Sequence, residues 1–516
     1  MSLSKPPPYV ALSYCWGKQE NPAKIIVNGV EVSVSANLYA ALLRLRTEGS
    51  LLVWADALCI NQRDYEERSI QVRRMFAIFT KAEAVAVWLG SDDGVDNASL
   101  ETICAKTDFD TSLREHPAFK SLVERAYWER VWVIQELAVA SSIIVFCGRY
   151  RIPWDLFVET SMTQVGDANK AVSRVRALCR LRDKTQAQKP VAFLDALYVS
   201  RAALSTDPRD KLYALLGLVF DGGSYIAEPN YMNSTAEVYV EFATALIRRG
   251  LPLDLIHLKS TQRQVIDNLP SWVPDWTDIS DEASRRVWDS INYAGKLITR
   301  LSRPQDIHIT TSELKTQGTF YGTVVEIGNV FSPTEDREFL NLIEVDDTDS
   351  FQPSLLGGDI EGLCLILAVR HLHKVAFFCK SQAKIPQNYW DAYTAWNNDN
   401  KTVLTKRHIM PECIQGMGDF FGSPGSSASF SECAVRLFLD VAKSGLRFLA
   451  TDRNTFGWAH PKAQRGDVLM KLSGCSQLSV LRPWHDGYRV VGAVFHPSFN
   501  LAGIPIEPER VTLTIF

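Results

Sequence analysis

The stretch Val85-Ala-Val-Trp-Leu89, which ends at Gly90, is a short and continuous apolar run. Similar runs occupy Tyr9–Tyr14, Leu51–Leu58 and Ile143–Cys147. Apolar runs of this length are typical of strands that are buried on both faces, as in a parallel sheet. The segments between them carry apolar residues at helical spacing. The sequence therefore predicts an α/β fold in which right-handed helical crossovers join parallel strands.

Local signals predict how the elements between these strands begin and turn. Asn28-Gly29 lies between two β-branched runs and predicts a hairpin, because both positions of such a turn take positive φ. Asn37 is the expected N-cap of one helix, and Asp64 is the expected start of another. Residues 127–139 are expected to form a single helix.

The chain is expected to contain three regions. Residues 1–150 form the α/β core, and residues 151–300 form a mainly helical extension. Residues 301–516 show short β-type runs mixed with other segments, which predicts a C-terminal α+β region. The clearest strands there are expected at Val468–Leu472, Leu478–Leu481 and Tyr488–Phe495.

Composition excludes several classes of protein. The 55 Lys and Arg against 59 Asp and Glu give a net charge of −4, so no basic surface for a nucleic acid is predicted. No apolar run approaches the roughly 18 residues of a membrane-spanning helix, and the N-terminus lacks the apolar centre of a signal peptide. We therefore expect a cytoplasmic protein with no nucleic-acid partner and no membrane span.

Neither a retained cofactor nor a metal is predicted. The motifs of P-loop proteins, Rossmann dehydrogenases, α/β-hydrolases and zincins do not occur in the sequence. His371 and His373 would share one face of a strand, but no third ligand lies near them in the sequence. The ten cysteines are scattered without a Cys-x-x-Cys pair and are expected to be free thiols in a reducing compartment.

Several blocks of sequence carry a family resemblance. The first blocks are Tyr9–Gly17, Trp54–Gln62 and Arg130–Leu137, with the run Val85–Gly90 between the last two. These blocks, in this order and spacing, resemble the fungal heterokaryon-incompatibility (HET) domain family. Further blocks with the same resemblance are Asp207–Gly217, Leu269–Trp276 and Gly466–Gly492.

This resemblance implies a role in non-self recognition, an innate-immunity function of fungi that ends in programmed cell death. It also implies a distant similarity to TIR domains, which have a flavodoxin-like fold and some of which cleave NAD. The catalytic glutamate of those TIR domains lies in a Ser-x-Trp-Cys-x-x-Glu-Leu pattern, which Trp132, Glu136 and Leu137 match. Arg130 and Val133 stand where that pattern has serine and cysteine. The resemblance thus makes Glu136 the candidate catalytic residue and NAD the candidate substrate.

The residue types suit that chemistry. Glu136 follows Trp132 by four residues, which places both on one face of a helix. Cleavage of nicotinamide from NAD passes through a cationic ribosyl centre, which a carboxylate beside an aromatic ring can stabilise. The structural alternative is that Glu136 forms an ion pair with Arg130 or Arg125.

Candidate substrate-binding residues follow the first two predicted strands, because ligands bind beyond the carboxyl ends of strands in open α/β sheets. Trp16 and Gly17 end the first strand. Asp56, Asn61 and Gln62 follow the second and could hydrogen-bond a ribose or a carboxamide. The alternative for this polar group is that it stabilises a turn.

Two charged pairs are interpreted as structural. Glu67 and Arg68 are expected to be a helix cap and a surface pair. Arg209 and Asp210 precede an apolar helix and are expected to form an ion pair with each other.

Three functions agree with the sequence. The first is a HET-domain protein of heterokaryon incompatibility whose TIR-like core signals by self-association, hydrolyses NAD through Glu136, or does both. The second is a non-catalytic signalling module that associates with itself, or with an unknown protein partner, through its α/β core. The third is a biosynthetic enzyme of fungal specialised metabolism that has reused the fold. Replacement of Glu136 by glutamine distinguishes the first from the second.

Overall fold

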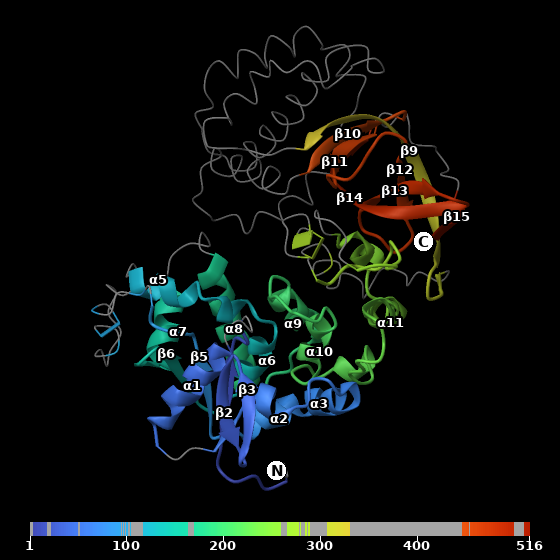
Figure 1. Cartoon of the computed structure of the whole chain (residues 1–516). Helices are drawn as coiled ribbons and strands as arrows, with labels where there is room; N and C mark the ends of the chain where they lie inside the picture. Colours follow the sequence, from blue (N-terminus) through green and yellow to red (C-terminus); the bar gives the residue numbers. More distant parts are fainter. Residues whose placement is uncertain are drawn as a thin grey trace, which may run out of the picture. The chain divides into compact units, whose positions relative to one another are not determined.

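The computed structural model of the 516-residue chain is shown in Figure 1. It describes residues 4–17, 22–49, 52–93, 117–163, 170–259, 266–277, 307–330, 446–453, 455–499 and 510–516, with isolated residues between 95 and 104 and between 279 and 291. The chain divides into two compact units, Met1–Ala245 and Leu246–Phe516. His371 and His373 lie outside the described residues.

A five-stranded sheet forms the centre of the first unit. In spatial order its strands are β4 (Val53–Trp54), β1 (Val10–Tyr14), β5 (Ala84–Trp88), β6 (Ile143–Cys147) and β7 (Tyr150–Pro153). The first four are parallel, and β7 is an antiparallel edge strand. Every residue of β1 and β5 is buried, which explains their continuous apolar sequence. The predicted α/β fold with a parallel sheet is confirmed.

The helices of the first unit come between and after these strands (Figure 1). In the part of this unit that the structure describes, they are α1 (Ala36–Arg46), α2 (Asp56–Cys59), α3 (Tyr65–Lys81), α5 (Pro117–Val123), the 3₁₀ helix η2 (Ala126–Glu129), α6 (Trp132–Ala138), α7 (Trp154–Thr163), α8 (Lys170–Gln186), α9 (Phe193–Ser200), α10 (Asp210–Leu216), η3 (Gly222–Ser224) and α11 (Thr235–Arg248), the last of which continues into the second unit. The expected helical content after residue 151 is therefore present in the described residues.

The two faces of β1 pack against different parts of the first unit. Val10, Leu12 and Tyr14 belong to the core cluster that includes Leu38 of α1. Because side chains alternate along a strand, Ser13 points to the opposite face of the sheet. There its hydroxyl meets α6, so the candidate catalytic helix lies across the sheet from α1.

Two predicted elements are wrong in extent. Leu51–Leu58 is not one strand, because α2 begins at Asp56, whose Oδ1 accepts a hydrogen bond from the Ala57 N–H at 2.7 Å. Residues 127–139 are not one helix, because Arg130 has extended backbone and pairs with Leu204 between η2 and α6.

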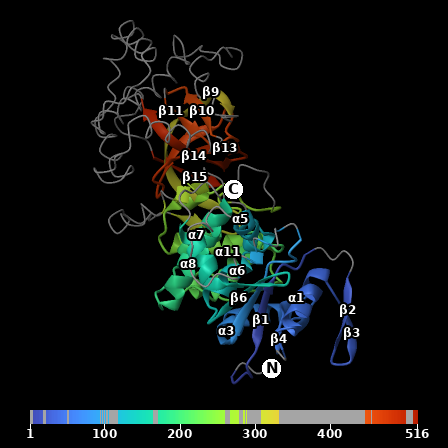
Figure 2. The same ribbon diagram turned by 90° about the vertical axis from the view of Figure 1, so that its left-hand side faces the viewer.

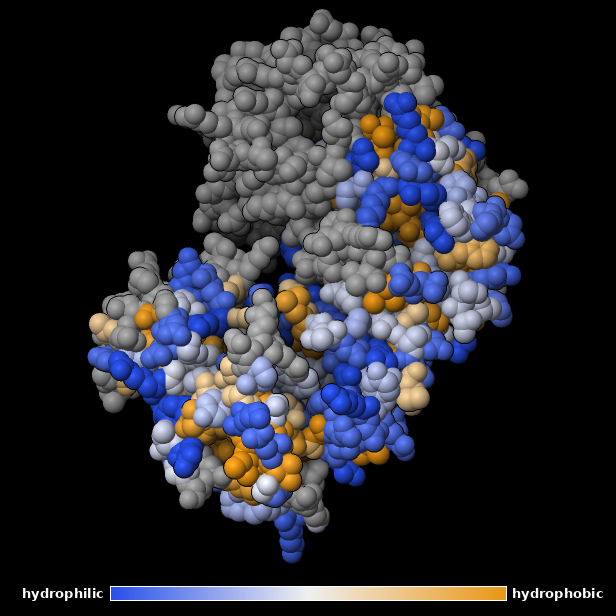
Figure 3. Space-filling model, viewed as in Figure 1, coloured by the Kyte–Doolittle hydropathy of each residue, from blue (hydrophilic) through white to orange (hydrophobic). Residues whose placement is uncertain are grey.

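The predicted hairpin is confirmed as β2 (Ala23–Val27) and β3 (Val30–Val34), joined by Asn28 at φ 51° and Gly29 at φ 80°. Figure 2 shows it beside α1. Hydrophobic residues gather over it in Figure 3, and Ile26 is 77% exposed and Val30 63% exposed. The hairpin thus presents apolar side chains to solvent.

One of the two predicted helix starts is confirmed. Asp64 is the N-cap of α3, and its carboxylate accepts from the N–H groups of Glu66 and Glu67. The N-cap of α1 is Ser35 rather than Asn37, and the Ser35 hydroxyl accepts from the Leu38 N–H at 3.2 Å. Asn37 lies in the first turn and uses its amide elsewhere.

The second unit contains a mixed sheet built around the long strand β9 (Leu314–Val330). The other strands are β8 (His308–Ile309), β10 (Arg447–Thr451), β11 (Thr455–Ala459), β12 (Val468–Leu472), β13 (Leu478–Trp484), β14 (Gly487–Phe499) and β15 (Arg510–Ile515). Strand β9 pairs with β8, β10, β12 and β15, all antiparallel. The three predicted C-terminal strands are confirmed as β12, β13 and β14.

The 3₁₀ helix η4 (Leu253–His257) also belongs to this unit and contacts β14. The sheet surrounds a cluster of buried apolar side chains that includes Val324, Leu469 and Val480. Among the described residues, no helix is long and apolar enough to cross a membrane.

Candidate functional site

A cavity of about 850 Å³ lies in the first unit at the carboxyl ends of β1 and β4. Residues that follow parallel strands meet at the same edge of the sheet, where α/β proteins bind ligands. The described lining residues are Cys15, Trp16 and Gly17 after β1; Asp56, Ile60 and Gln62 after β4; Arg68, Val72 and Met75 of α3; Ala126, Arg130 and Trp132 around η2 and α6; and residues 204–210, Tyr231 and Thr235.

The structure brings together most of the residues predicted from the strand ends. Trp16 Nε1 donates to Asp56 Oδ2 at 2.8 Å, and the Gln62 amide donates to the Asp56 carbonyl oxygen at 3.4 Å. Asp56 therefore both stabilises the start of α2 and lines the cavity. Asn61 is not among the described lining residues, and its Oδ1 accepts from the Arg63 N–H at 3.2 Å.

The loop after β1 is held by Asn37. Its Nδ2 donates to the Cys15 carbonyl oxygen at 2.7 Å, and its Oδ1 accepts from Trp88 Nε1 at 2.8 Å. Gly17, the last residue of this rim, has φ +70°, a conformation that other residues adopt only with strain. These contacts fix the position at which Trp16 enters the cavity.

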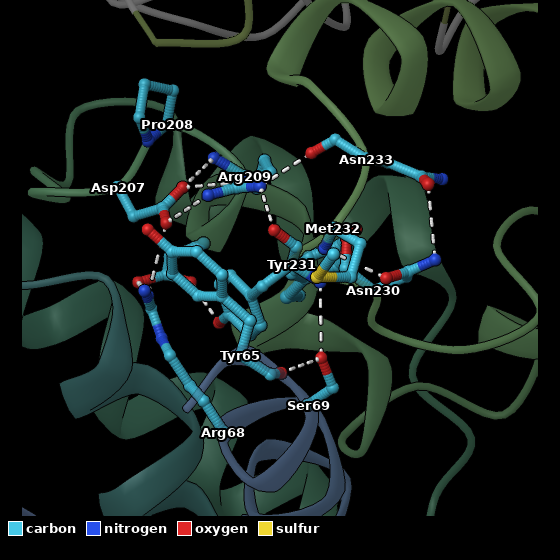
Figure 4. A network of polar contacts seen from close by, with 12 residues as sticks. Tyr65, Arg68, Ser69, Asp207, Pro208, Arg209, Asn230, Tyr231, Met232 and Asn233 are labelled. Atoms are coloured by element: carbon cyan, nitrogen blue, oxygen red, sulfur yellow. Dashed lines mark hydrogen bonds and ion pairs between the residues drawn. The ribbon is translucent and has the colours of Figure 1, made fainter. Parts of the chain in front are cut away.

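The opposite wall comes from a turn before α10 (Figure 4). The expected ion pair between Arg209 and Asp210 is wrong. Arg209 instead pairs with Asp207 through two hydrogen bonds of 2.9 and 2.8 Å, because the two side chains lie on the same side of the turn. Arg209 Nη1 donates to the carbonyl oxygens of Tyr231 and Asn233, which ties this wall to the segment before α11.

Asp210 is buried at the start of α10 and has other partners. Its carboxylate accepts from Trp132 Nε1 at 3.1 Å and from the Tyr231 hydroxyl, and lies 3.5 Å from Arg68 Nη2. Burial raises the pKa of Asp210 to about 6, although the Tyr231 hydrogen bond and Arg68 oppose this shift. Trp132 thus contacts the carboxylate of Asp210, which lines the cavity and was not a candidate binding residue in the sequence.

Arg68 also has a different place from the expected surface pair. Its guanidinium carbon lies 3.7 Å from the centre of the Tyr231 ring, and Nη2 lies 3.2 Å from Asp207 Oδ2 (Figure 4). This stacking places a cation in the cavity wall. The sequence near Arg68 does not predict this position, because its partners Tyr231 and Asp207 lie far along the chain.

Glu136 is buried in α6, 3% exposed, and is not among the described lining residues. Ser13 Oγ donates to Glu136 Oε2, and the Tyr127 hydroxyl lies 2.7 Å from Ser13 Oγ. Arg130 Nη1 lies 3.8 Å from Glu136 Oε2, which is the ion pair of the structural alternative. Burial raises the pKa of the Glu136 carboxyl, and Arg130 and Ser13 lower it in part.

Arg130 connects Glu136 with the cavity. It lines the cavity while Nη1 approaches the Glu136 carboxylate, and this buried Nη1 makes no hydrogen bond within the described structure. Its extended backbone, paired with Leu204, explains how the side chain reaches both places. An N–H donor without an acceptor at a cavity wall suits an anionic ligand.

Comparison with known proteins agrees with the sequence blocks. Residues 9–136 match the family model described as Heterokaryon incompatibility protein (HET). The match supports the HET family for this segment. This HET segment contains β1, β4, β5 and α6 up to Glu136, but it ends before the cavity wall formed by Asp207 and Asp210.

A curated relative supports the same family. The chain is 28% identical over 423 residues to Heterokaryon incompatibility protein 6, OR allele, of Neurospora crassa. The similarity covers 63% of this chain and 61% of the relative, so the chain spans less than two thirds of that protein. No solved structure matches the chain.

Proposed function

We propose that this chain acts in fungal heterokaryon incompatibility, in non-self recognition that leads to programmed cell death in the cytoplasm, and that its HET segment binds and hydrolyses NAD. The HET match and the similarity to the Neurospora crassa protein support the biological role. The observation that carries the proposed chemistry is Arg130, which joins a cavity to the buried carboxylate of Glu136.

The position and size of the cavity support a dinucleotide ligand. The parallel strands follow the order β4-β1-β5-β6, which is the second, first, third and fourth strand in sequence, as in flavodoxin-like sheets. This order supports the TIR-like part of the proposal. A volume of about 850 Å³ falls within the range of small-molecule sites.

The lining residues divide the binding task. Arg209 uses its donors on Asp207 and two carbonyl oxygens, so it shapes the wall rather than binding phosphate. Arg130, whose Nη1 makes no hydrogen bond and lies 3.8 Å from Glu136 Oε2, is the side chain that would donate to a pyrophosphate oxygen. Trp16 and Trp132 offer aromatic surface to the nicotinamide and adenine rings.

In the proposed reaction, water replaces nicotinamide at C1′ of the ribose. The glycosidic C–N bond breaks, its electron pair neutralises the pyridinium ring, and the attacking water loses a proton to solvent as its oxygen bonds to C1′. The Glu136 carboxylate stabilises the cationic ribosyl centre. Because Glu136 is enclosed by Ser13 and Arg130, we propose that the pyrophosphate draws Arg130 toward the cavity and thereby opens the carboxylate to the ribose.

A non-catalytic module is the second candidate, and the enclosed position of Glu136 favours it. In that case the Ser13–Glu136–Arg130 contacts are structural, and signalling proceeds by self-association of the α/β core or by docking of a protein partner. The exposed apolar side chains of the β2–β3 hairpin support self-association. No observation on the described residues favours a biosynthetic enzyme.

The test is nicotinamide release from NAD by the purified full chain, compared with Glu136→Gln. Glu129→Gln is the matched control, because Glu129 precedes the same helix but pairs with Arg174, whereas Glu136 pairs with Arg130. We expect release by the wild type and by Glu129→Gln, and loss of release in Glu136→Gln with unchanged circular dichroism. Full activity of Glu136→Gln would remove Glu136 from the mechanism. No release by the concentrated wild type would refute NAD hydrolysis and leave the module.

A further inference from the structure

Three potential metal ligands meet in the second unit, apart from the cavity. Asp254 and His257 lie in η4, and Cys475 lies in the turn between β12 and β13. Their exposed fractions are 1%, 3% and 7%. The carboxylate oxygen, ring nitrogen and sulfur atoms of the three residues all lie within 4.8 Å of one another.

The fold brings these residues together by local geometry and by backbone contacts. In a 3₁₀ helix, side chains three residues apart lie on the same side, so Asp254 and His257 both face the turn. The Leu253 N–H donates to the Gly474 carbonyl oxygen at 2.9 Å and holds η4 against the turn. Asp254 accepts from the N–H groups of Ser476 and Gln477, which orients its carboxylate.

The ring of His257 has one partner and one orphaned nitrogen. Nε2 lies 2.8 Å from Ser479 Oγ, while the buried Nδ1 makes no hydrogen bond within the described structure and lies 3.9 Å from Asp254 Oδ1. Ser479 holds Nε2 and the buried Nδ1 makes no hydrogen bond, which is the arrangement of a metal-binding histidine whose second nitrogen is fixed.

We propose that Asp254, His257 and Cys475 bind a zinc ion. Nitrogen, sulfur and carboxylate oxygen are the ligands that zinc prefers, and three protein ligands leave the fourth tetrahedral position to water. A thiolate and a carboxylate together balance the charge of a divalent ion. The ion therefore gives the unsatisfied ring nitrogen of His257 a partner and balances the charge of the buried Asp254 carboxylate, which already accepts hydrogen bonds from Ser476 and Gln477.

The function of the zinc ion is to fix η4 to the β12–β13 turn. Lys471, the cation at the end of β12, does not replace it, because its Nζ donates to the Ser476 carbonyl oxygen instead of pairing with Asp254. This site does not depend on NAD hydrolysis. Asp254 and His257 are three residues apart in η4, but Cys475 lies far along the sequence, so the three ligands form no compact sequence motif.

The first experiment uses the wild-type full chain. Zinc content is measured after extensive dialysis, and the chelator-treated protein is then titrated with Co²⁺. We expect stoichiometric zinc, and a cobalt spectrum with tetrahedral d–d bands and a thiolate-to-cobalt charge-transfer band. Absence of stoichiometric zinc together with a Co²⁺ spectrum that lacks the thiolate band would overturn the proposal, whatever the variants do.

Variants then assign the ligands. Cys475→Ser should lose the charge-transfer band, and His257→Gln and Asp254→Asn should each weaken Co²⁺ binding at least tenfold. Cys179→Ser is the matched control, since Cys179 is a buried free thiol of the first unit and should leave the spectrum unchanged. A charge-transfer band that persists in Cys475→Ser would contradict the assignment. If Cys475→Ser does not fold, the melting temperature of the wild type is measured with and without Zn²⁺. A rise that is absent in His257→Gln would support the site, and no rise in the wild type would count against it.

Discussion

Replacement of Asp210 by asparagine tests whether burial governs this carboxylate at the cavity wall. The side chain has a pKa of about 6 in the folded protein and an ordinary value of 3.8. A difference of about 2 units corresponds to about 3 kcal/mol, at roughly 1.4 kcal/mol per unit. Because the folded state holds the proton more tightly, the wild type is more stable at low pH and loses this free energy as the pH rises from about 4 to about 6.

The asparagine side chain cannot titrate, so Asp210→Asn removes this dependence. Its Oδ1 can still accept from Trp132 Nε1, and its amide can donate to the Tyr231 hydroxyl oxygen, so both hydrogen bonds have a replacement. We expect the free energy of unfolding of Asp210→Asn, relative to the wild type, to rise by about 2 kcal/mol between pH 4 and pH 6.5, which is most of the full difference.

The assay is urea unfolding of the full chain at closely spaced pH values, with the wild type and the variant measured side by side. Asp207→Asn is the matched control. Its carboxyl is also partly buried, but hydrogen bonds from Arg209 outweigh burial and lower its pKa, so its stabilisation is lost as the pH falls. The two variants should therefore change the pH dependence in opposite directions. Parallel curves for Asp210→Asn and the wild type would refute the reasoning, because Asp210 would then have an ordinary pKa.

Three further predictions concern the rest of the first unit. Gly17→Ala should lower stability by about 1–2 kcal/mol, because alanine at φ +70° is strained, and a melting temperature equal to that of the wild type would contradict this. Asp64→Ala should cost about 1 kcal/mol through loss of the N-cap of α3, checked by urea unfolding against Asp93→Ala, an exposed aspartate outside any helix. Ile26→Lys should reduce any self-association seen by analytical ultracentrifugation, whereas an unchanged sedimentation profile of an associating wild type would exclude the hairpin as the contact.

The parallel sheet could be predicted because its strands are buried on both faces, which leaves continuous apolar runs such as Ala84–Trp88. The hairpin could be predicted because Asn28-Gly29 is a local signal. Element ends were harder to predict. Ser35 and Asn37 are both good N-cap residues, and only the extended backbone of Ser35 decides between them. The break at Arg130 depends on Leu204, which no local pattern reveals.

The candidate site divides in the same way. Trp16, Asp56 and Gln62 could be placed together because the edge of a parallel sheet follows from strand order. Arg68 and Asp210 could not, since their position in the cavity depends on Tyr231 and on the turn before α10. The enclosure of Glu136 by Ser13 depends on which face of β1 meets α6, and a strand buried on both faces gives no such sign.

The two walls of the cavity also differ in when they are made. During translation the parallel strands are synthesised first, and the last of them, β6, ends at Cys147. Asp207 and Asp210, which form the other wall of the cavity, are synthesised about sixty residues later. A nascent chain can therefore assemble its sheet while Arg68 and Trp132 still lack Tyr231 and Asp210 as partners. During that interval the cavity lacks one wall and cannot enclose a ligand. The cavity is complete only after translation has passed Thr235, the first residue of α11.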